Sequence, residues 1–159
     1  MTPRPHRDLA LAFVTAAAAF ATFWPLYEHL VRQGGSRPYA WRDMTGRIGS
    51  LSLARPSGHL FHSQRDLTRY IHSAVAGRRA ARIPLKGREA ILVAAGPRSS
   101  TGYRVSILSV TEQRGRILVR ALERTPGLDN NVRPVVTSPY RFITFRASRK
   151  PVFLDWVGR

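Results

Sequence analysis

Residues 103–124 read YRVSILSVTEQRGRILVRALER and predict a β-hairpin. Apolar side chains alternate with Arg or Ser through residues 103–107 and again through 116–121, which is the period of two typical of half-buried strands. Residues 113–115, Gln-Arg-Gly, separate the two runs, and Gly115 is free to adopt the positive φ angle that a tight turn needs. A mainly β fold is therefore the starting expectation.

Further short strands are expected on both sides of this hairpin. Residues 89–95 form an apolar run between two glycines, 132–137 and 140–145 flank a break at Pro139, and 152–154 follow another proline. No helical pattern separates consecutive strands, so parallel βαβ units are not expected. The sequence predicts a small antiparallel β-sandwich or barrel of about five to seven strands.

One amphipathic helix is expected to lead into these strands, over residues 64–76. Ser63 stands three residues before Asp66, which is the arrangement of a helix start, and Gly77 follows the last turn. Apolar residues recur at helical spacing between these two marks: Leu67, Tyr70, Ile71, Ala74 and Val75.

An uncharged run of residues rich in Ala and Phe, 9–27, lies close to the amino terminus. Its length is close to the roughly 20 residues that a membrane-spanning helix needs, and Arg4 and Arg7 precede it. Trp24 and Tyr27 favour a retained signal anchor, because aromatic residues gather at the membrane interface. Ala-Phe-Ala at 19–21 is instead typical of the cleavage site of a signal peptide. The run carries no polar stripe, which disfavours a buried amphipathic helix.

These features lead us to expect a single-pass protein of the cell membrane with its domain outside the cytoplasm, or a secreted protein if cleavage occurs near Ala21. Four downstream arginines favour the opposite orientation under the positive-inside rule, namely Arg32, Arg37, Arg42 and Arg47.

The expected organisation has three parts. Residues 1–31 form the signal anchor or signal peptide, and 32–58 form a linker rich in Gly, Pro and Arg, with at most one short strand at 48–53. Residues 59–159 form the β-rich domain.

The composition and motifs argue against several classes of protein. The chain has no cysteine, which excludes disulfides, a thiol nucleophile and Cys-ligated metal. No Gly-rich phosphate loop, G-x-S-x-G elbow or H-E-x-x-H motif is present. His59 and His62 are spaced by three residues, but no third ligand lies near them in the sequence. We therefore expect neither an enzyme nor a metal or cofactor site, and no small-molecule substrate.

The charge suggests an anionic partner. The chain has 26 Lys and Arg against 9 Asp and Glu, a net charge of +17. Arginines stand beside Tyr103, Tyr140 and Phe145, which is typical of single-stranded nucleic-acid binding and equally of half-buried strands with rings inward and charges outward. Anionic lipid headgroups near the anchor are a third target for this charge.

Four segments resemble the PrcB family of protease-complex subunits, in its carboxy-terminal domain. They are GPRSSTGYRVSI at 96–107, VRALE at 119–123, TPG at 125–127 and TSPY at 137–140. The family has a Thr-Gly-Gly-Tyr loop, a strand that ends in Glu before a Pro-Gly loop, and a Thr-x-Pro element before a later strand. The similarity in order and spacing extends over about residues 60–157. The chain departs from the family at residues 99–101, whereas Gly102 and Tyr103 match the motif.

The resemblance implies a non-enzymatic, membrane-associated binding module, an accessory or stabilising subunit of another envelope protein, with a secreted peptidase as one candidate. A basic module that binds nucleic acid or another polyanion is the alternative. We expect the loops at 97–102, 125–131 and 137–140 to meet at one end of the fold, with Arg98 as a surface charge. The candidate partner-binding residues are Arg98, Ser100, Thr101, Gly102, Tyr103, Pro126, Gly127, Ser138, Pro139 and Tyr140.

Overall fold

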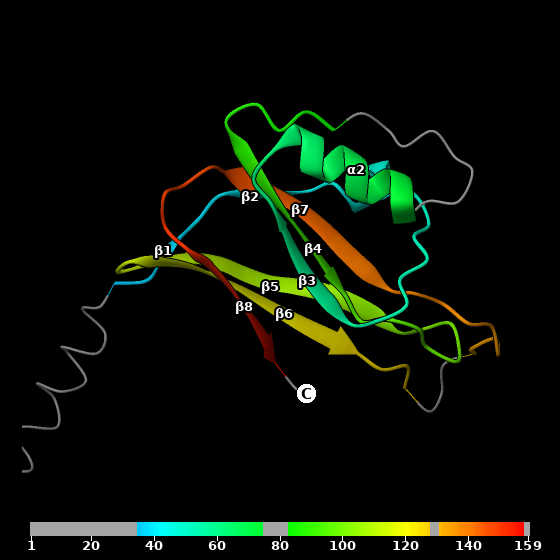
Figure 1. The fold of residues 1–159 in the computed structure, drawn as a ribbon. Coiled ribbons are helices and arrows are strands. Elements are labelled where there is room, and N and C mark those ends of the chain that lie inside the picture. The colour runs from blue at the N-terminus through cyan, green and yellow to red at the C-terminus, as the bar shows by residue number, and fades with distance from the viewer. Residues whose placement is uncertain (1–34, 75–82, 128–130, 158–159) are drawn as a thin grey trace, which may run out of the picture. The chain divides into compact units, whose positions relative to one another are not determined.

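The computed structural model describes residues 35–74, 83–127 and 131–157. The chain divides into two compact units, Met1–Gly35 and Ser36–Arg159, and the fold described here is that of the second (Figure 1). The expected signal or anchor segment, residues 1–31, lies outside the described residues. Among the residues that are described, no helix is both long and apolar enough to cross a membrane.

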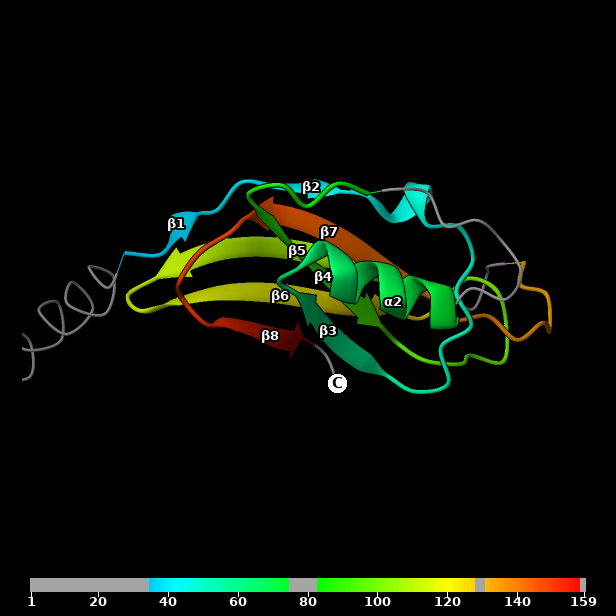
Figure 2. The ribbon, with the colours of Figure 1, turned by 45° about the horizontal axis from the view of Figure 1, so that its top comes forward.

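Two four-stranded sheets and one helix make up this unit. The first, here called the β5 sheet, has the order β1-β5-β6-β8 and contains β1 (Arg37–Pro38), β5 (Arg104–Gln113), β6 (Arg116–Arg124) and β8 (Val152–Val157). The second, the β4 sheet, has the order β2-β7-β4-β3 and contains β2 (Trp41–Asp43), β7 (Tyr140–Arg146), β4 (Arg88–Ala94) and β3 (Ser57–Phe61). The helix α2 (Gln64–Ala74) lies over the β4 sheet, and a 3-10 turn, η1 (Thr45–Arg47), follows β2 (Figures 1 and 2).

Strand β4 is buried on both faces and separates two apolar cores. Ala90 and Leu92 belong to the core that also contains Leu67 of α2. Ile91 and Val93 point the other way, into the core between the two sheets. A strand covered on both faces has no need of polar alternation, which explains the continuous apolar run seen in the sequence.

Several expectations are confirmed. The fold is mainly β with one helix in the described residues, and it is a sandwich of two sheets with no closed barrel. Strands β5 and β6 pair as an antiparallel hairpin in which Gly115 has a φ angle of +83°. The helix begins as predicted, because the Ser63 hydroxyl accepts a hydrogen bond from the backbone N–H of Asp66 and donates one to its carboxylate. The predicted helix end at Ala76 lies outside the described residues.

Two expectations about strands were wrong. Strand β8 pairs with β6 in parallel, so the β5 sheet is mixed and not antiparallel. The connection between them runs through β7 in the other sheet, which is a crossover that a search for βαβ patterns does not detect. Residues 132–137 form no strand, because their pairing is reduced to one isolated bridge between Thr137 and Arg98.

Residues 36–58 belong to the compact unit, where the sequence predicted a linker. Strands β1 and β2 pair with β5 and β7 at sheet edges. Residues 48–53 form no strand, but Ile48, Leu51 and Leu53 are buried in the core beneath α2. Strands of two or three residues are too short to show a period, so Gly and Pro dominated the prediction for this segment.

Candidate partner-binding groove

An open groove of about 980 Å³ lies at the end of the sandwich where β4 and β6 finish and β5 and β7 begin. Three segments form its walls: 45–52 around η1, 101–103 before β5, and 136–140 at the start of β7. Ala74, at the end of α2, completes the lining. Two of the three loops expected to meet at one end of the fold, 97–102 and 137–140, contribute to the groove, whereas no described residue of 125–131 lines it. Residues 45–52 add a wall that the sequence did not predict.

Backbone hydrogen bonds join the loop before β5 to the loop before β7. Arg98 and Thr137 exchange two of them, with N···O distances of 2.8 and 2.9 Å. The Thr137 hydroxyl donates to the carbonyl oxygen of Ser100 at 2.9 Å. The backbone N–H of Thr101 donates to the Arg133 carbonyl at 3.0 Å, and the Arg133 N–H donates back to the Thr101 hydroxyl at 2.9 Å. The two loops therefore form one braced structure.

Gly102 occupies a position that a side chain could not. Its φ angle is +99°, and a Cβ atom there would lie 2.9 Å from side-chain atoms of both Pro126 and Val132. Glycine alone tolerates this conformation readily and also allows the close approach. Gly102 therefore brings the loop that carries Pro126 against the loop that carries Tyr103.

Tyr140 links β7 to the wall around η1. Its hydroxyl donates to the carbonyl oxygen of Gly49, and the Thr45 carbonyl lies 3.4 Å away. Burial raises the pKa of the Tyr140 hydroxyl, with a smaller contribution from the nearby Asp43 carboxylate. The hydroxyl therefore remains a donor through the neutral range. The Thr45 hydroxyl adds a second link, since it accepts a hydrogen bond from the backbone N–H of Phe142 at 2.9 Å.

Arg98 is not the free surface charge that we expected. Its Nε and Nη2 atoms donate to the two carboxylate oxygens of Glu123, with 2.7 Å between Nη2 and Oε2. The two side chains are only 22% and 12% exposed. The hydrogen bond to Glu123 raises the pKa of Arg98 above its usual value. The Arg98 guanidinium also lies 5.9 Å from the ring centre of Tyr103. Arg98 therefore supports the loop 101–103 without lining the groove.

Six of the ten candidate residues line the groove: Thr101, Gly102, Tyr103, Ser138, Pro139 and Tyr140. The other four lie outside the lining. Arg98 and Ser100 brace the loops through the contacts above, and Pro126 packs near Gly102. Gly127 follows Pro126 and is not among the lining residues.

Residues 45–52 were missed as a wall, although one signal for them was present. Ile48 and Leu51 are apolar residues within a segment otherwise rich in Gly, Ser and Arg, and both are buried in the core as well as lining the groove.

The groove has a neutral lining and a positive rim. No lining residue is charged. Three exposed arginines lie within or close to the lining segments in the sequence, at Arg47, Arg104 and Arg133, and none of the three makes an ion pair within the described residues. Every carboxylate of the described part of the chain is already paired with a basic side chain, so the positive charge of the rim is not neutralised.

The histidines do not converge on a site. The ring centre of His59 lies 4.5 Å from that of Phe61 and 4.6 Å from that of Tyr70, whereas His62 contacts Glu89 through Nδ1 at 2.8 Å. Within residues 35–74, 83–127 and 131–157, no group of three His, Asp or Glu side chains is placed to hold a metal ion.

Residues 90–146 match the family model described as PrcB C-terminal. The resemblance to the PrcB family is confirmed over these residues. The matched region runs from β4 to β7, so it includes the two groove walls that hydrogen bonds join, 101–103 and 136–140. The third wall, 45–52, lies before it in the sequence. No curated protein and no solved structure matches the chain.

Proposed function

We propose that this protein is a non-enzymatic binding module that docks a segment of another envelope protein in the groove. In this proposal it acts as an accessory or stabilising subunit, a secreted peptidase is the leading candidate partner, and residues 9–27 hold the module at the membrane. The observation that carries the proposal is the open groove, two walls of which come from the PrcB C-terminal domain. A protease-complex role is consistent with that family.

The lining supports binding over catalysis. The groove presents hydroxyl groups from Thr45, Ser50 and Thr101, but its lining residues include no histidine or carboxylate that would activate a hydroxyl as a nucleophile. Peptide-binding sites need only shape, apolar contacts and backbone groups.

The form and charge of the groove indicate what it would accept. Val136 lines the groove and remains 72% exposed, so it offers apolar surface to an incoming chain. The arginines of the rim favour acidic residues on either side of the docked stretch, because complementary charges orient the partner and speed association. The expected ligand is therefore an extended, uncharged segment of a protein with acidic flanking residues.

Photo-crosslinking of the full chain in envelope membranes tests this proposal. A photoreactive amino acid replaces Val136 in one sample and the exposed Ser99, which does not line the groove, in another. The proposal expects one discrete protein adduct at position 136, resistant to nuclease, and none at 99. The same adducts at both positions, or none at 136, would contradict it.

An occluding variant provides a second readout. Gly46 lines the groove, and a Cβ atom there would meet nothing within 4 Å, so this position has room for a side chain and Gly46→Leu should obstruct the groove. This change should reduce recovery of the adduct at least tenfold, whereas Ser99→Leu should leave it unchanged.

A polyanion-binding module is the second candidate function, and one observation favours it. Only five Arg or Lys side chains of the described residues have a carboxylate partner, which leaves most of the basic charge uncompensated. Binding of this kind should weaken steeply with salt. Against it, Phe142 and Phe145 are fully buried and cannot stack on bases. Retention of an oligonucleotide at physiological salt would support this candidate, and loss at that salt would exclude it.

A further inference from the structure

Four segments meet at the end of the compact unit that is remote from the groove. Strand β5 is ten residues long; it begins next to the groove and ends at Gln113, where the hairpin turns into β6 (Figure 1). At this end, Arg37 of β1 lies opposite Glu112 of β5 in the antiparallel strand register. The turn between β7 and β8 reaches the same place, because the Pro151 carbonyl accepts a hydrogen bond from the N–H of Ile117 at 2.9 Å.

The turn before β4 joins this group. The backbone N–H of Ala147 donates to the Gly87 carbonyl at 3.1 Å, which links the turn before β4 to the turn after β7. The hydroxyl of Tyr39, just after β1, donates to the carbonyl of Arg146 at 3.0 Å. The start of β1, the β5–β6 turn, the β7–β8 turn and the turn before β4 are therefore contiguous.

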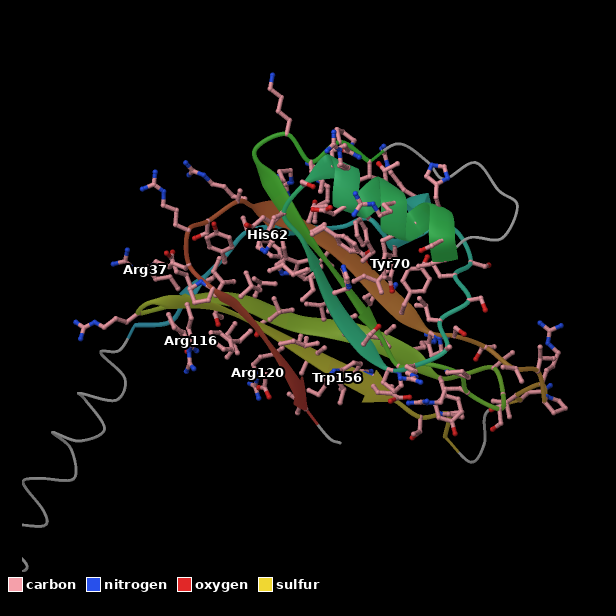
Figure 3. All side chains as sticks on the ribbon, in the orientation of Figure 1. Arg37, His62, Tyr70, Arg116, Arg120 and Trp156 are labelled. Carbon is pink, nitrogen blue, oxygen red and sulfur yellow. The ribbon has the colours of Figure 1, made fainter. Side chains whose placement is uncertain are left out.

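Exposed basic side chains project from all four segments, and we call this surface the basic end. Its members are Arg37, Lys86, Arg114, Arg116, Arg146 and Arg149. None of them makes an ion pair with a carboxylate of the described residues. Figure 3 shows Arg37 and Arg116 near the hairpin at this end.

The carboxylates nearby do not neutralise this surface. Glu112 is already bonded to Lys150, with 2.6 Å between Nζ and Oε1. Glu89 is buried and contacts His62. The net field at the basic end is therefore strongly positive.

The basic end is also where the chain enters the compact unit, at Ser36. Residues 28–35 separate the uncharged run 9–27 from this point. Even a fully extended chain of that length reaches only about 28 Å. If residues 9–27 are held in a bilayer, the short connection 28–35 can bring the basic end, which carries Ser36, to the bilayer surface.

We propose that the basic end binds the anionic phospholipid headgroups of the leaflet that faces the domain. The inference rests on the membrane association proposed above and extends it by naming the lipid class and the residues. Guanidinium groups suit this role, because their donors match the geometry of phosphate oxygens. The groove, at the other end of β5, is then left open to a protein partner.

The arrangement fits a lipid surface better than a nucleic acid. The cations are spread over four segments, and single-stranded nucleic acids are usually held in a groove lined by exposed rings. On the hairpin side, the ring of Phe153 already has the Arg116 guanidinium 5.9 Å from its centre.

A labelling experiment on the full chain tests the proposal. Because the chain has no cysteine, one introduced cysteine gives a unique position for a fluorophore. Ala147→Cys reports on the basic end, and Ser99→Cys reports on the groove end, both at exposed positions. The labelled chain is reconstituted into vesicles of phosphatidylcholine, with or without 30% phosphatidylglycerol, that carry a nitroxide quencher on a headgroup.

The label at 147 should be quenched at least threefold more with phosphatidylglycerol than without it, and the label at 99 should not respond. Replacing Arg114 and Arg149 together with Gln should abolish the difference, whereas Arg55→Gln with Arg124→Gln should preserve it. Equal quenching at 147 and 99, or quenching independent of phosphatidylglycerol, would overturn the inference while leaving membrane association intact.

Two further outcomes would overturn the lipid proposal on other grounds. A full chain that fails to co-float with either vesicle would overturn the proposed membrane association and this inference together. If an oligonucleotide at physiological salt removed the quenching at 147, the basic end would be a nucleic-acid site, and the lipid proposal would be wrong.

Discussion

Arg98 and Glu123 form a bidentate ion pair that connects the loop after β4 to the end of strand β6. The pair is about four-fifths or more buried on both sides, so the loss of one partner would leave a charge with reduced access to water. The same loop carries three of the groove residues, 101–103. The ion pair therefore supports the groove without contacting its interior.

Arg98→Ala should lower the free energy of unfolding by about 1–3 kcal/mol, because Glu123 loses its bidentate partner. Chemical denaturation of the variant and the parent measures this difference. Arg98→Lys should recover only part of the loss, since an ammonium group cannot match both carboxylate oxygens. If Arg98→Ala were neutral, the pair would have no supporting role.

Gly102→Ala should destabilise the fold by about 2–4 kcal/mol. About 1–2 kcal/mol comes from the positive φ angle, and the remainder comes from the contacts with Pro126 and Val132. Gly115→Ala is the matched control, because Gly115 also has a positive φ angle but a Cβ atom there would meet nothing within 4 Å. The destabilisation caused by Gly115→Ala should be limited to the contribution of the positive φ angle, about 1–2 kcal/mol. Equal costs for the two variants would show that the close approach at Gly102 is unimportant.

Tyr140→Phe should cost about 1 kcal/mol, because the Gly49 carbonyl loses its donor. Amide hydrogen exchange in residues 45–52 should accelerate, since this wall loses a link to β7. Tyr39→Phe removes a comparable hydroxyl bond at the other end of the unit, to the Arg146 carbonyl. That control should leave exchange in residues 45–52 unchanged, and acceleration in both variants would contradict a local effect.

The pKa of Glu112 should lie below its ordinary value near 4.5, chiefly because Lys150 donates a hydrogen bond to it. The contribution of the pair to stability is then complete above that ordinary pKa and is lost as the pH falls through the lowered one. Lys150→Met should raise the pKa of Glu112, and Arg37→Met should raise it less, because Arg37 acts only through its charge. Carboxyl NMR titration measures both, and the reverse order would refute this assignment.

The elements that the sequence predicted well are those whose signals are local. The β5–β6 hairpin follows from alternation around one glycine, and the start of α2 follows from Ser63 and Asp66. The gathering of loops around Gly102 and Ser138 could be expected, since both loops lie at ends of neighbouring strands.

The remainder depends on contacts between residues far apart in the chain. Glu123 is 25 positions from Arg98, and no local pattern pairs them. The Tyr140 hydroxyl meets Gly49 across 91 positions, which is why the wall at 45–52 was missed. The parallel pairing of β8 with β6 depends on how the two sheets stack, and a strand's own residues do not specify its direction relative to a neighbour.

That parallel pairing bears on how the fold is completed during synthesis. Val152, Leu154 and Trp156 pack against the core between the sheets, and they are among the last described residues to leave the ribosome. Until they emerge, β6 has an open edge and its side of the core is uncovered, which are conditions that favour pairing with other chains. The nascent protein is therefore most exposed to aggregation in the interval before β8 closes the β5 sheet.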